Sequence, residues 1–144
     1  MSPKKIVEVI HAFGHPNIRA SHPTTIMFTK ENHVTKKGDC IVAVAADKSV
    51  ADLSAEFKDA LRQPNAKLII QIEVDGLKGQ INASGSPELA LNHPNDLVIR
   101  KSEFISDRTL AVKADKSSGD LSKAVVEKLK NPKQEVTLTL IVEA

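Results

Sequence analysis

The sequence predicts a single α+β domain built from two tandem βββαβ repeats with pseudo-twofold symmetry, containing about eight strands and two helices. Three observations lead to this prediction. The composition is that of a globular protein, one half of the chain resembles the other, and each half carries strand-like segments around one helix-like segment. We expect one domain over residues 1–144, with the internal repeat at 5–74 and 77–143.

The bulk composition narrows the class of protein. A chain of 144 residues with 41% hydrophobic and 26% charged residues matches one folded domain and argues against disorder. Its apolar runs are short and no signal-peptide core precedes the first strand, so we expect neither export nor membrane insertion. The single cysteine, Cys40, makes no internal disulfide and favours a cytoplasmic location. A net charge of +2 is too small for a dedicated duplex-DNA binder.

The repeat emerges when the sequence is aligned with itself. Without a gap, residues 41–74 match 109–142 at 12 of 34 positions, where chance would give roughly two or three matches. Upstream, residues 10–30 match 81–101, including a shared Gly-x-Pro and a shared His-Pro. Coincidence combined with common helix-capping chemistry is the alternative explanation, but it does not account for these two matches. The sequence therefore predicts a duplication.

Local patterns place the elements of the first unit. Alternating and β-branched residues predict the strands. Ser49 followed by Asp52 indicates a helix start, because the hydroxyl can accept from a free backbone N–H and the carboxylate favours the positive helix end. Pro64 stops the apolar face that follows. The predicted elements are strands at 5–13, 24–29, 40–45 and 67–74 and a helix at 49–62.

The second unit repeats this order of elements. Asp75-Gly76 between the units is a tight-hairpin signal, so the fourth and fifth strands should pair antiparallel. By pseudo-symmetry the last strand should lie beside the first, which either closes a barrel or joins one continuous sheet, with both helices packed outside. The same symmetry should relate the loops 14–23 and 85–94. The predicted elements are strands at 77–83, 97–101, 109–112 and 135–143 and a helix at 118–129.

The loop after the first strand concentrates polar side chains. His11, His15 and His22 are candidate metal ligands, and together with Asp39 they are candidate catalytic groups, because neutral imidazole binds metals and shuttles protons. Their spacing fits no established ligand signature, so a structural or surface role is the alternative. Cys40 has no identifiable base partner, and we interpret it as a buried strand residue rather than a nucleophile.

Basic residues occupy matching positions in the two units. They are Lys30, Lys36 and Lys37 in the first unit and Arg100, Lys101 and Arg108 in the second. If symmetry brings these loops together, they could hold a phosphate or an RNA backbone, and a solvated edge is the alternative. The chain has no Trp and no Tyr, and we assign Phe13 and Phe57 to the core, so a base-stacking platform is not expected. The candidate binding residues are Asn17, Arg19, Lys37, Arg100, Lys101 and Arg108.

Several short motifs are distributed along the chain. They are Gly14-His15-Pro16-Asn17-Ile18, Gly38-Asp39-Cys40-Ile41, Ala46-Asp47-Lys48, Arg100-Lys101-Ser102, Arg108-Thr109 and Ala114-Asp115-Lys116. Together they resemble the archaeal family known as domain of unknown function DUF371, over essentially the whole chain. The resemblance implies an archaeal cytosolic protein and supplies no activity. It also implies that a carboxylate often stands where this chain has Met27, which would remove one potential metal ligand or base here.

These observations support three functional hypotheses. The leading one is a binding protein that contacts RNA, a ribonucleoprotein or another phosphate-bearing ligand through the paired basic loops. The alternative is a small metal-dependent or acid–base enzyme that uses the histidine cluster of the first unit. A structural subunit of a larger assembly is the third. Phosphate-loop and dinucleotide fingerprints are absent, and the sequence assigns no cofactor, reaction or oligomeric state.

Overall fold

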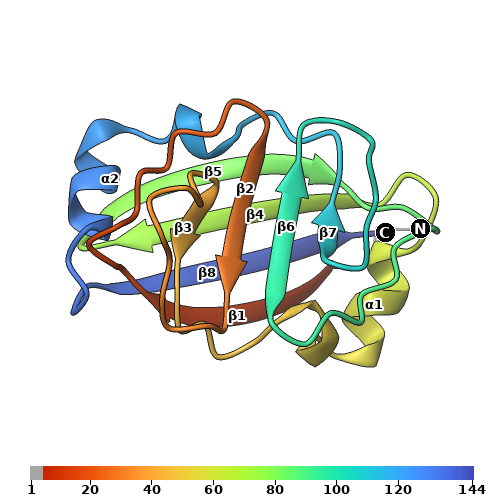
Figure 1. Cartoon of the computed structure of the whole chain (residues 1–144). Helices are drawn as coiled ribbons and strands as arrows, with labels where there is room; N and C mark the ends of the chain where they lie inside the picture. The colour runs from red at the N-terminus through yellow and green to blue at the C-terminus, as the bar shows by residue number, and fades with distance from the viewer. Residues whose placement is uncertain (1–4) are drawn as a thin grey trace.

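The computed structural model describes residues 5–144, which form two four-stranded β-sheets packed face to face with a short α-helix at either end (Figure 1). The protein is therefore a single α+β domain. Its elements are β1 (Lys5–Phe13), β2 (Thr25–Thr29), β3 (Ile41–Ala43), the 3₁₀ turn η1 (Val50–Asp52), α1 (Ala55–Leu61), β4 (Lys67–Val74), β5 (Leu77–Ser84), β6 (Asp96–Arg100), β7 (Thr109–Ala111), the 3₁₀ turn η2 (Ser118–Asp120), α2 (Lys123–Leu129) and β8 (Glu135–Glu143).

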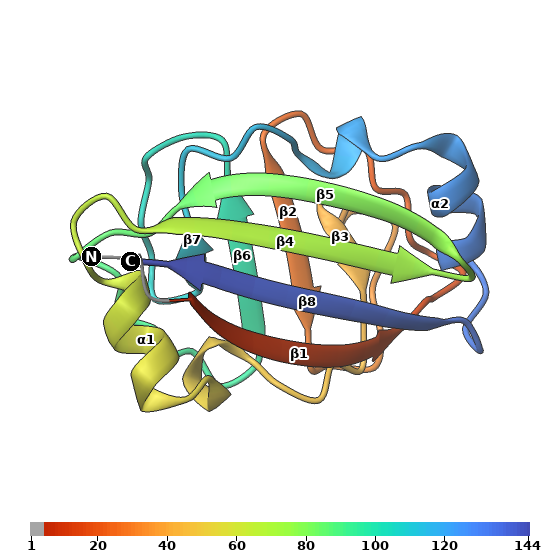
Figure 2. The ribbon, with the colours of Figure 1, turned by 180° about the vertical axis from the view of Figure 1, so that it is seen from behind.

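The larger sheet has the strand order β1-β8-β4-β5 and is antiparallel throughout. Its strands form because apolar and polar residues alternate along them. In β8, for example, Val136, Leu138, Leu140 and Val142 are buried, whereas the residues between them are partly exposed. One face of this sheet therefore packs on the core and the other faces outward, as Figure 2 shows.

Two predicted strand pairings are confirmed. The β4–β5 hairpin turns at Asp75 and Gly76, whose φ angles of 50° and 78° are the left-handed values that a two-residue turn needs. Strand β1 pairs antiparallel with β8 along its whole length, with Lys5 opposite Glu143 at one end. The first and last strands of the described chain are thus neighbours.

The smaller sheet has the strand order β3-β2-β6-β7. Strands β2 and β6 pair antiparallel in the middle, and each also pairs with a parallel outer strand. These strands run across those of the larger sheet (Figure 1). Ile26 and Phe28 of β2 and Leu97 and Ile99 of β6 point into the core that the two sheets share.

The prediction of a closed barrel or one continuous sheet is wrong, because the chain forms two separate sheets. The sheets meet at two corners, through antiparallel bridges between Phe13 and Val44 and between Ser84 and Val112. Phe13 is 37% exposed at its corner, contrary to its assignment to the core, whereas Phe57 is fully buried as predicted.

The single helix predicted in each unit is also corrected. Each one is divided into a 3₁₀ turn and a separate short α-helix, because Leu53 and Leu121 adopt extended backbone angles between them. A new helix then begins, with the Ser54 hydroxyl accepting from the Phe57 amide in α1. Ser122 does the same in α2. A second capping serine after an extended leucine therefore restarts each helix.

Each helix packs against a loop of the opposite half of the chain. Gly14 lies against the carbonyl of Leu129 in α2, and Gly85 lies against the carbonyl of Leu61 in α1. A Cβ at either position would collide with that backbone, so both sites need glycine. The residue after each glycine donates its backbone N–H to the same carbonyl, at 2.8 Å in the first half and 3.1 Å in the second. The two halves therefore hold each other's helix ends.

Candidate functional site

The outer face of the smaller sheet combines polar side chains with unusual burial. Because side chains alternate along a strand, the residues between the core-facing ones of β2 and β6 point outward. Met27 and Val98 lie opposite each other in the middle of this face and are only 7% and 2% exposed, although both lie outside the core cluster. Flanking segments therefore cover the middle of the face. The outward pairs are Thr25 with Arg100, Met27 with Val98 and Thr29 with Asp96.

Arg108, directly before β7, reaches across this face. Its Nε lies 3.0 Å from Oδ2 of Asp96, a carboxylate that is nearly buried. The Nε–H does not point at that oxygen, so the contact is an ion pair without a hydrogen bond. The other Asp96 oxygen accepts from the Thr29 hydroxyl at 2.7 Å. On the far side, Nη2 of Arg108 lies 3.2 Å from the Met27 sulfur, which is a weak acceptor. Arg108 is thus fixed in place with donor capacity left over.

Arg100, the last residue of β6, is the second guanidinium of this face. Its Nε is buried and has no hydrogen-bond partner within residues 5–144. The guanidinium lies 5.0 Å from the centre of the Phe104 ring. Burial, and after it the charge of Arg108, lowers the pKa of Arg100. The site therefore holds two cations that repel each other, and neither Nε–H has a hydrogen-bond acceptor within residues 5–144.

Cys40, directly before β3, is a free, half-buried thiol of the same cluster. Burial raises the pKa of the Cys40 thiol, and the charge of Asp39 raises it further, while Arg108 and Arg100 act in the opposite direction with smaller effects. The thiol is therefore protonated near neutral pH, which does not suit a nucleophile. Cys40 lies just outside β3 and is only half-buried, whereas the sequence predicted a buried strand residue.

The two halves of the chain differ chemically at this face. In the alignment of 10–30 with 81–101, the uncharged Thr25 and Thr29 correspond to the charged Asp96 and Arg100. Likewise, Cys40 stands in the first half where Arg108 stands in the second. The buried charges of the site thus come from the second half alone. Asp96 stands directly before the predicted strand 97–101 and four residues from Arg100, a spacing that places both on one face of an extended strand and could have revealed Asp96.

A comparison with known proteins places the chain in a family. Residues 10–143 match the model of the family described as domain of unknown function DUF371. The chain belongs to this family. The resemblance seen in the sequence is confirmed. The uncharacterized protein MJ0206 of the archaeon Methanocaldococcus jannaschii is 48% identical over 126 residues, which cover 88% of this chain and 93% of that relative.

In this DUF371 protein, the candidate histidines serve their own loops. Nδ1 of His22 accepts from the Thr24 and Thr25 amides, each at 3.1 Å. His93 makes the equivalent contacts in the second half. Nδ1 of His15 accepts from the Asn17 amide at 3.0 Å. These ring nitrogens stabilise turns, which is the structural role that we had weighed for them.

The other acid–base candidates lie on different parts of the molecule. His11 is exposed on β1, where its Nδ1 lies 3.4 Å from the Asp47 carboxylate. Asp39 lies beside Cys40 and its backbone carbonyl accepts from the Ser21 amide at 2.9 Å. Within residues 5–144, no group of three or more His, Cys, Asp and Glu side chains is arranged to hold a metal ion. The enzyme hypothesis gains no geometric support.

The candidate basic residues divide into paired and unpaired ones. Lys101 lies 2.9 Å from the Asp120 carboxylate, and Lys30 makes the equivalent 3.0 Å pair with Asp52. Arg19 is exposed and donates to the Lys36 carbonyl at 3.4 Å. Asn17 donates to the Val34 carbonyl at 2.9 Å, and Lys37 is exposed. Lys30 and Lys101 therefore neutralise carboxylates, while Arg19 and Lys37 extend into solvent.

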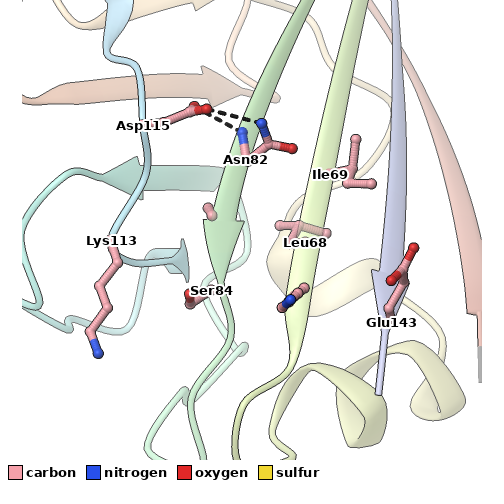
Figure 3. Close-up of a pocket in the computed structure, with 9 residues that line it drawn as sticks. Leu68, Ile69, Asn82, Ser84, Lys113, Asp115 and Glu143 are labelled. Carbon is pink, nitrogen blue, oxygen red and sulfur yellow. Dashed lines mark hydrogen bonds between the residues drawn. The ribbon is translucent and has the colours of Figure 1, made fainter. Parts of the chain in front are cut away.

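A hollow of about 440 Å³ lies elsewhere, near the end of β5 (Figure 3). It includes Asn82, whose side chain and backbone amide both bond the Asp115 carboxylate at 2.9 Å. Ser84, Lys67, Lys113 and Glu143 complete its polar lining. None of the predicted site residues lines it. Because its central polar groups already bond each other, it is a weaker candidate binding site than the arginine pair.

No helix within the described chain is long and apolar enough to cross a membrane.

Proposed function

We propose that the protein binds a phosphate-bearing ligand on the outer face of the smaller sheet, through Arg100 and Arg108. The buried Nε of Arg100, which has no acceptor within residues 5–144, carries this proposal. A buried donor without a partner costs about 1–3 kcal/mol, and an anion that accepts from it recovers that cost. We call this pair of guanidinium groups the arginine site.

The chemistry of the arginine site favours a phosphate group. Guanidinium binds phosphate and carboxylate oxygens through parallel N–H donors. The two guanidinium groups repel each other, and a bound group with more than one negative charge would offset this repulsion. Asp96 offsets part of the charge of Arg108 and leaves that of Arg100 uncompensated. A phosphate monoester or a nucleic-acid phosphate would supply this charge.

The phosphate has two plausible sources, a small molecule and RNA. Exposed Arg19 and Lys37 in the first half support an RNA backbone that continues beyond the arginine site. The pairing of Lys101 with Asp120 argues against a long basic track through the second half. In both cases Arg100 would hold a phosphate group, so the experiment first tests whether Arg100 contributes to phosphate binding.

Isothermal titration calorimetry with inorganic phosphate and with a single-stranded oligoribonucleotide tests the proposal. Arg100→Met should weaken binding of either probe by about tenfold or more, because it removes a charge-assisted hydrogen bond. Lys123→Met removes one exposed charge from α2 and should have no effect. If RNA is the ligand, Lys37→Met weakens the oligoribonucleotide alone. Absence of binding by both probes at low salt and millimolar phosphate would contradict the proposal.

We also infer that the two halves arose by duplication and are related by a pseudo-twofold axis. The identical order of elements in 5–74 and 77–143 supports this. So do matching capping boxes at Ser49 and Ser117 and the crossed glycine contacts. A cytoplasmic location is proposed on the free thiol of Cys40. Superposition of the two halves in an experimental structure tests the duplication, and halves that do not superpose strand on strand would contradict it.

A further inference from the structure

We infer that the outer face of the larger sheet is an interface between two copies of this chain. Figure 2 shows this face in front, with α1 and α2 at its ends and no described segment across it. Val7 and Val9 are 55% and 38% exposed there, although surface positions of a solvated sheet normally carry polar residues. Two adjacent exposed valines on an edge strand indicate a surface that is covered in use.

Charge is distributed over this face in bands. Strand register places the outward residues in four rows that cross all four strands. The two central rows contain no charged residue and are Val7, Ile141, Ile69 and Asn82, then Val9, Thr139, Gln71 and Gln80. The two outer rows carry the charges and are Lys5, Glu143, Lys67 and Ser84, then His11, Thr137, Glu73 and Lys78. An uncharged centre with a charged rim is the pattern of a protein interface.

The rows of one copy can be paired with those of a second copy by a twofold axis that lies parallel to the sheet and perpendicular to its strands. Each strand then lies antiparallel on its own counterpart, so the two central rows face each other. Val7 meets Val9 of the second copy, Asn82 meets its Gln80, and Lys67 meets its Glu73. The exposed valines, the amides at the β5 edge and one pair of opposite charges therefore meet, whereas Ile141 and Ile69 meet Thr139 and Gln71 of the second copy. An axis along the strands would pair Ile69 with Ile141 and Lys67 with Glu143, but it would place both exposed valines against the amides Asn82 and Gln80, so the first arrangement is favoured.

The size of the face indicates a weak dimer. Four strands at about 4.8 Å spacing and nine residues at about 3.3 Å rise cover roughly 550 Å² per copy. Both copies together therefore bury about 1,100 Å², which is at the low end of specific interfaces. We expect association that depends on concentration, with a dissociation constant in the micromolar range.

Sedimentation velocity over a wide concentration range tests the interface. The wild-type chain should pass from monomer to dimer as its concentration rises. Lys67→Glu and Glu73→Lys should each raise the dissociation constant by about tenfold or more, because each creates like-charge contacts across the twofold axis. The double variant Lys67→Glu with Glu73→Lys should restore the dimer. Lys123→Glu on α2 is the matched control and should leave association unchanged.

Within one chain, Lys67 lies opposite Glu143 and Glu73 lies opposite Lys78, so each swap also places like charges side by side in the sheet, an effect that does not depend on protein concentration. Lys67 and Glu73 lie on the same strand, about 20 Å apart, so they do not pair with each other inside one copy. Circular dichroism and thermal unfolding should show that all variants fold. A monomer at every concentration would overturn the inference. So would a double variant that stays as weak as the single ones.

Discussion

Arg100 combines a stability cost with the binding role that we propose for it. Its buried Nε–H has no acceptor within the described chain, and neighbouring Arg108 carries the same charge. Natural proteins retain such groups where function requires them, because an unpaired buried donor lowers the stability of the fold. The side chain of Arg100 should therefore behave differently in stability and in binding measurements.

Replacing Arg100 by methionine tests this separation. The methionine keeps the apolar stem and removes the guanidinium, so the free energy of unfolding should stay unchanged or rise by up to about 1 kcal/mol. Urea denaturation followed by circular dichroism measures it. Phosphate binding should fall in the same variant. A loss of stability above about 1 kcal/mol would show that the guanidinium has a structural partner.

Asp96 should respond in the opposite way. Asp96→Asn removes the countercharge of Arg108, and we expect the free energy of unfolding to fall by about 1–3 kcal/mol, since the pair is only partly screened by water. Thr29→Val is the matched variant, because it removes the 2.7 Å hydrogen bond to the same carboxylate and keeps the charge. Its smaller loss, measured in the same denaturation series, would confirm that the charge dominates. Equal losses would contradict this.

At the scale of elements, the strands were predicted within two residues at each end, and the helices were not. Alternation of apolar residues fixes a strand from local sequence alone. The helices fail because Leu53 continues the apolar spacing while its backbone is extended. Ser54 looks like an ordinary helical position until its hydroxyl is seen to cap α1. Spacing cannot distinguish one helix from a turn followed by a restarted helix.

The serines that cap α1 and α2 should contribute measurably to the stability of the fold. Ser54→Ala and Ser122→Ala should each lower the free energy of unfolding by about 1 kcal/mol, because each removes an acceptor for an unpaired helix amide. Guanidinium denaturation measures the loss. Lys123→Ala, next to the second cap, is the control and should change stability by less than about 0.5 kcal/mol. An unaffected Ser54→Ala variant would mean that α1 does not depend on its cap.

The turns before the helices also predict how stability depends on pH. Hydrogen bonds from Lys101 and from the Ser117 amide lower the pKa of Asp120 to about 2. The Ser49 amide and Lys30 likewise lower the pKa of Asp52. A lowered pKa in the folded state stabilises the fold above the unfolded value and loses this effect as protons bind.

The unfolding temperature should therefore fall as the pH decreases from about 4 to about 2. Differential scanning calorimetry across that range measures the fall. Asp120→Asn should be less stable near neutral pH and should lose less on acidification than the wild-type protein. An identical pH profile in both would contradict the assigned role of Asp120.

At the scale of the whole molecule, the sequence was sufficient for the hairpin and for the β1–β8 pairing, and insufficient for the division into two sheets. The pairing of β2 with β6 joins residues about seventy positions apart, and no local signal specifies it. The pairing of β6 with β7 brings Arg108 to Asp96 and Arg100, and the pairing of β2 with β6 adds Met27 and Thr29 to the arginine site. Arg100 and Arg108 could be named from their charge, but the contact of Arg108 with Met27 depends on this long-range register.

A circular permutant tests the organisation of the whole fold. The described chain begins at Lys5, which pairs with Glu143, the residue before the last one, Ala144. Joining Ala144 to Lys5 by a short linker and opening the chain between Asp75 and Gly76 should give a protein that unfolds cooperatively, since no buried element is cut. Thermal denaturation and near-ultraviolet circular dichroism measure this. A permutant that stays unfolded would contradict it.

If the two halves arose by duplication, as we propose, the crossed contacts of Gly14 with Leu129 and of Gly85 with Leu61 limit the route by which the fold arose. A polypeptide of half this length would leave its helix end uncapped by the neighbour's loop, so it would be complete only when two identical polypeptides exchanged these contacts. Covalent fusion of such a pair would end the requirement for identical chains. One half could then acquire Asp96, Arg100 and Arg108 while the other kept threonine and cysteine at the matching positions.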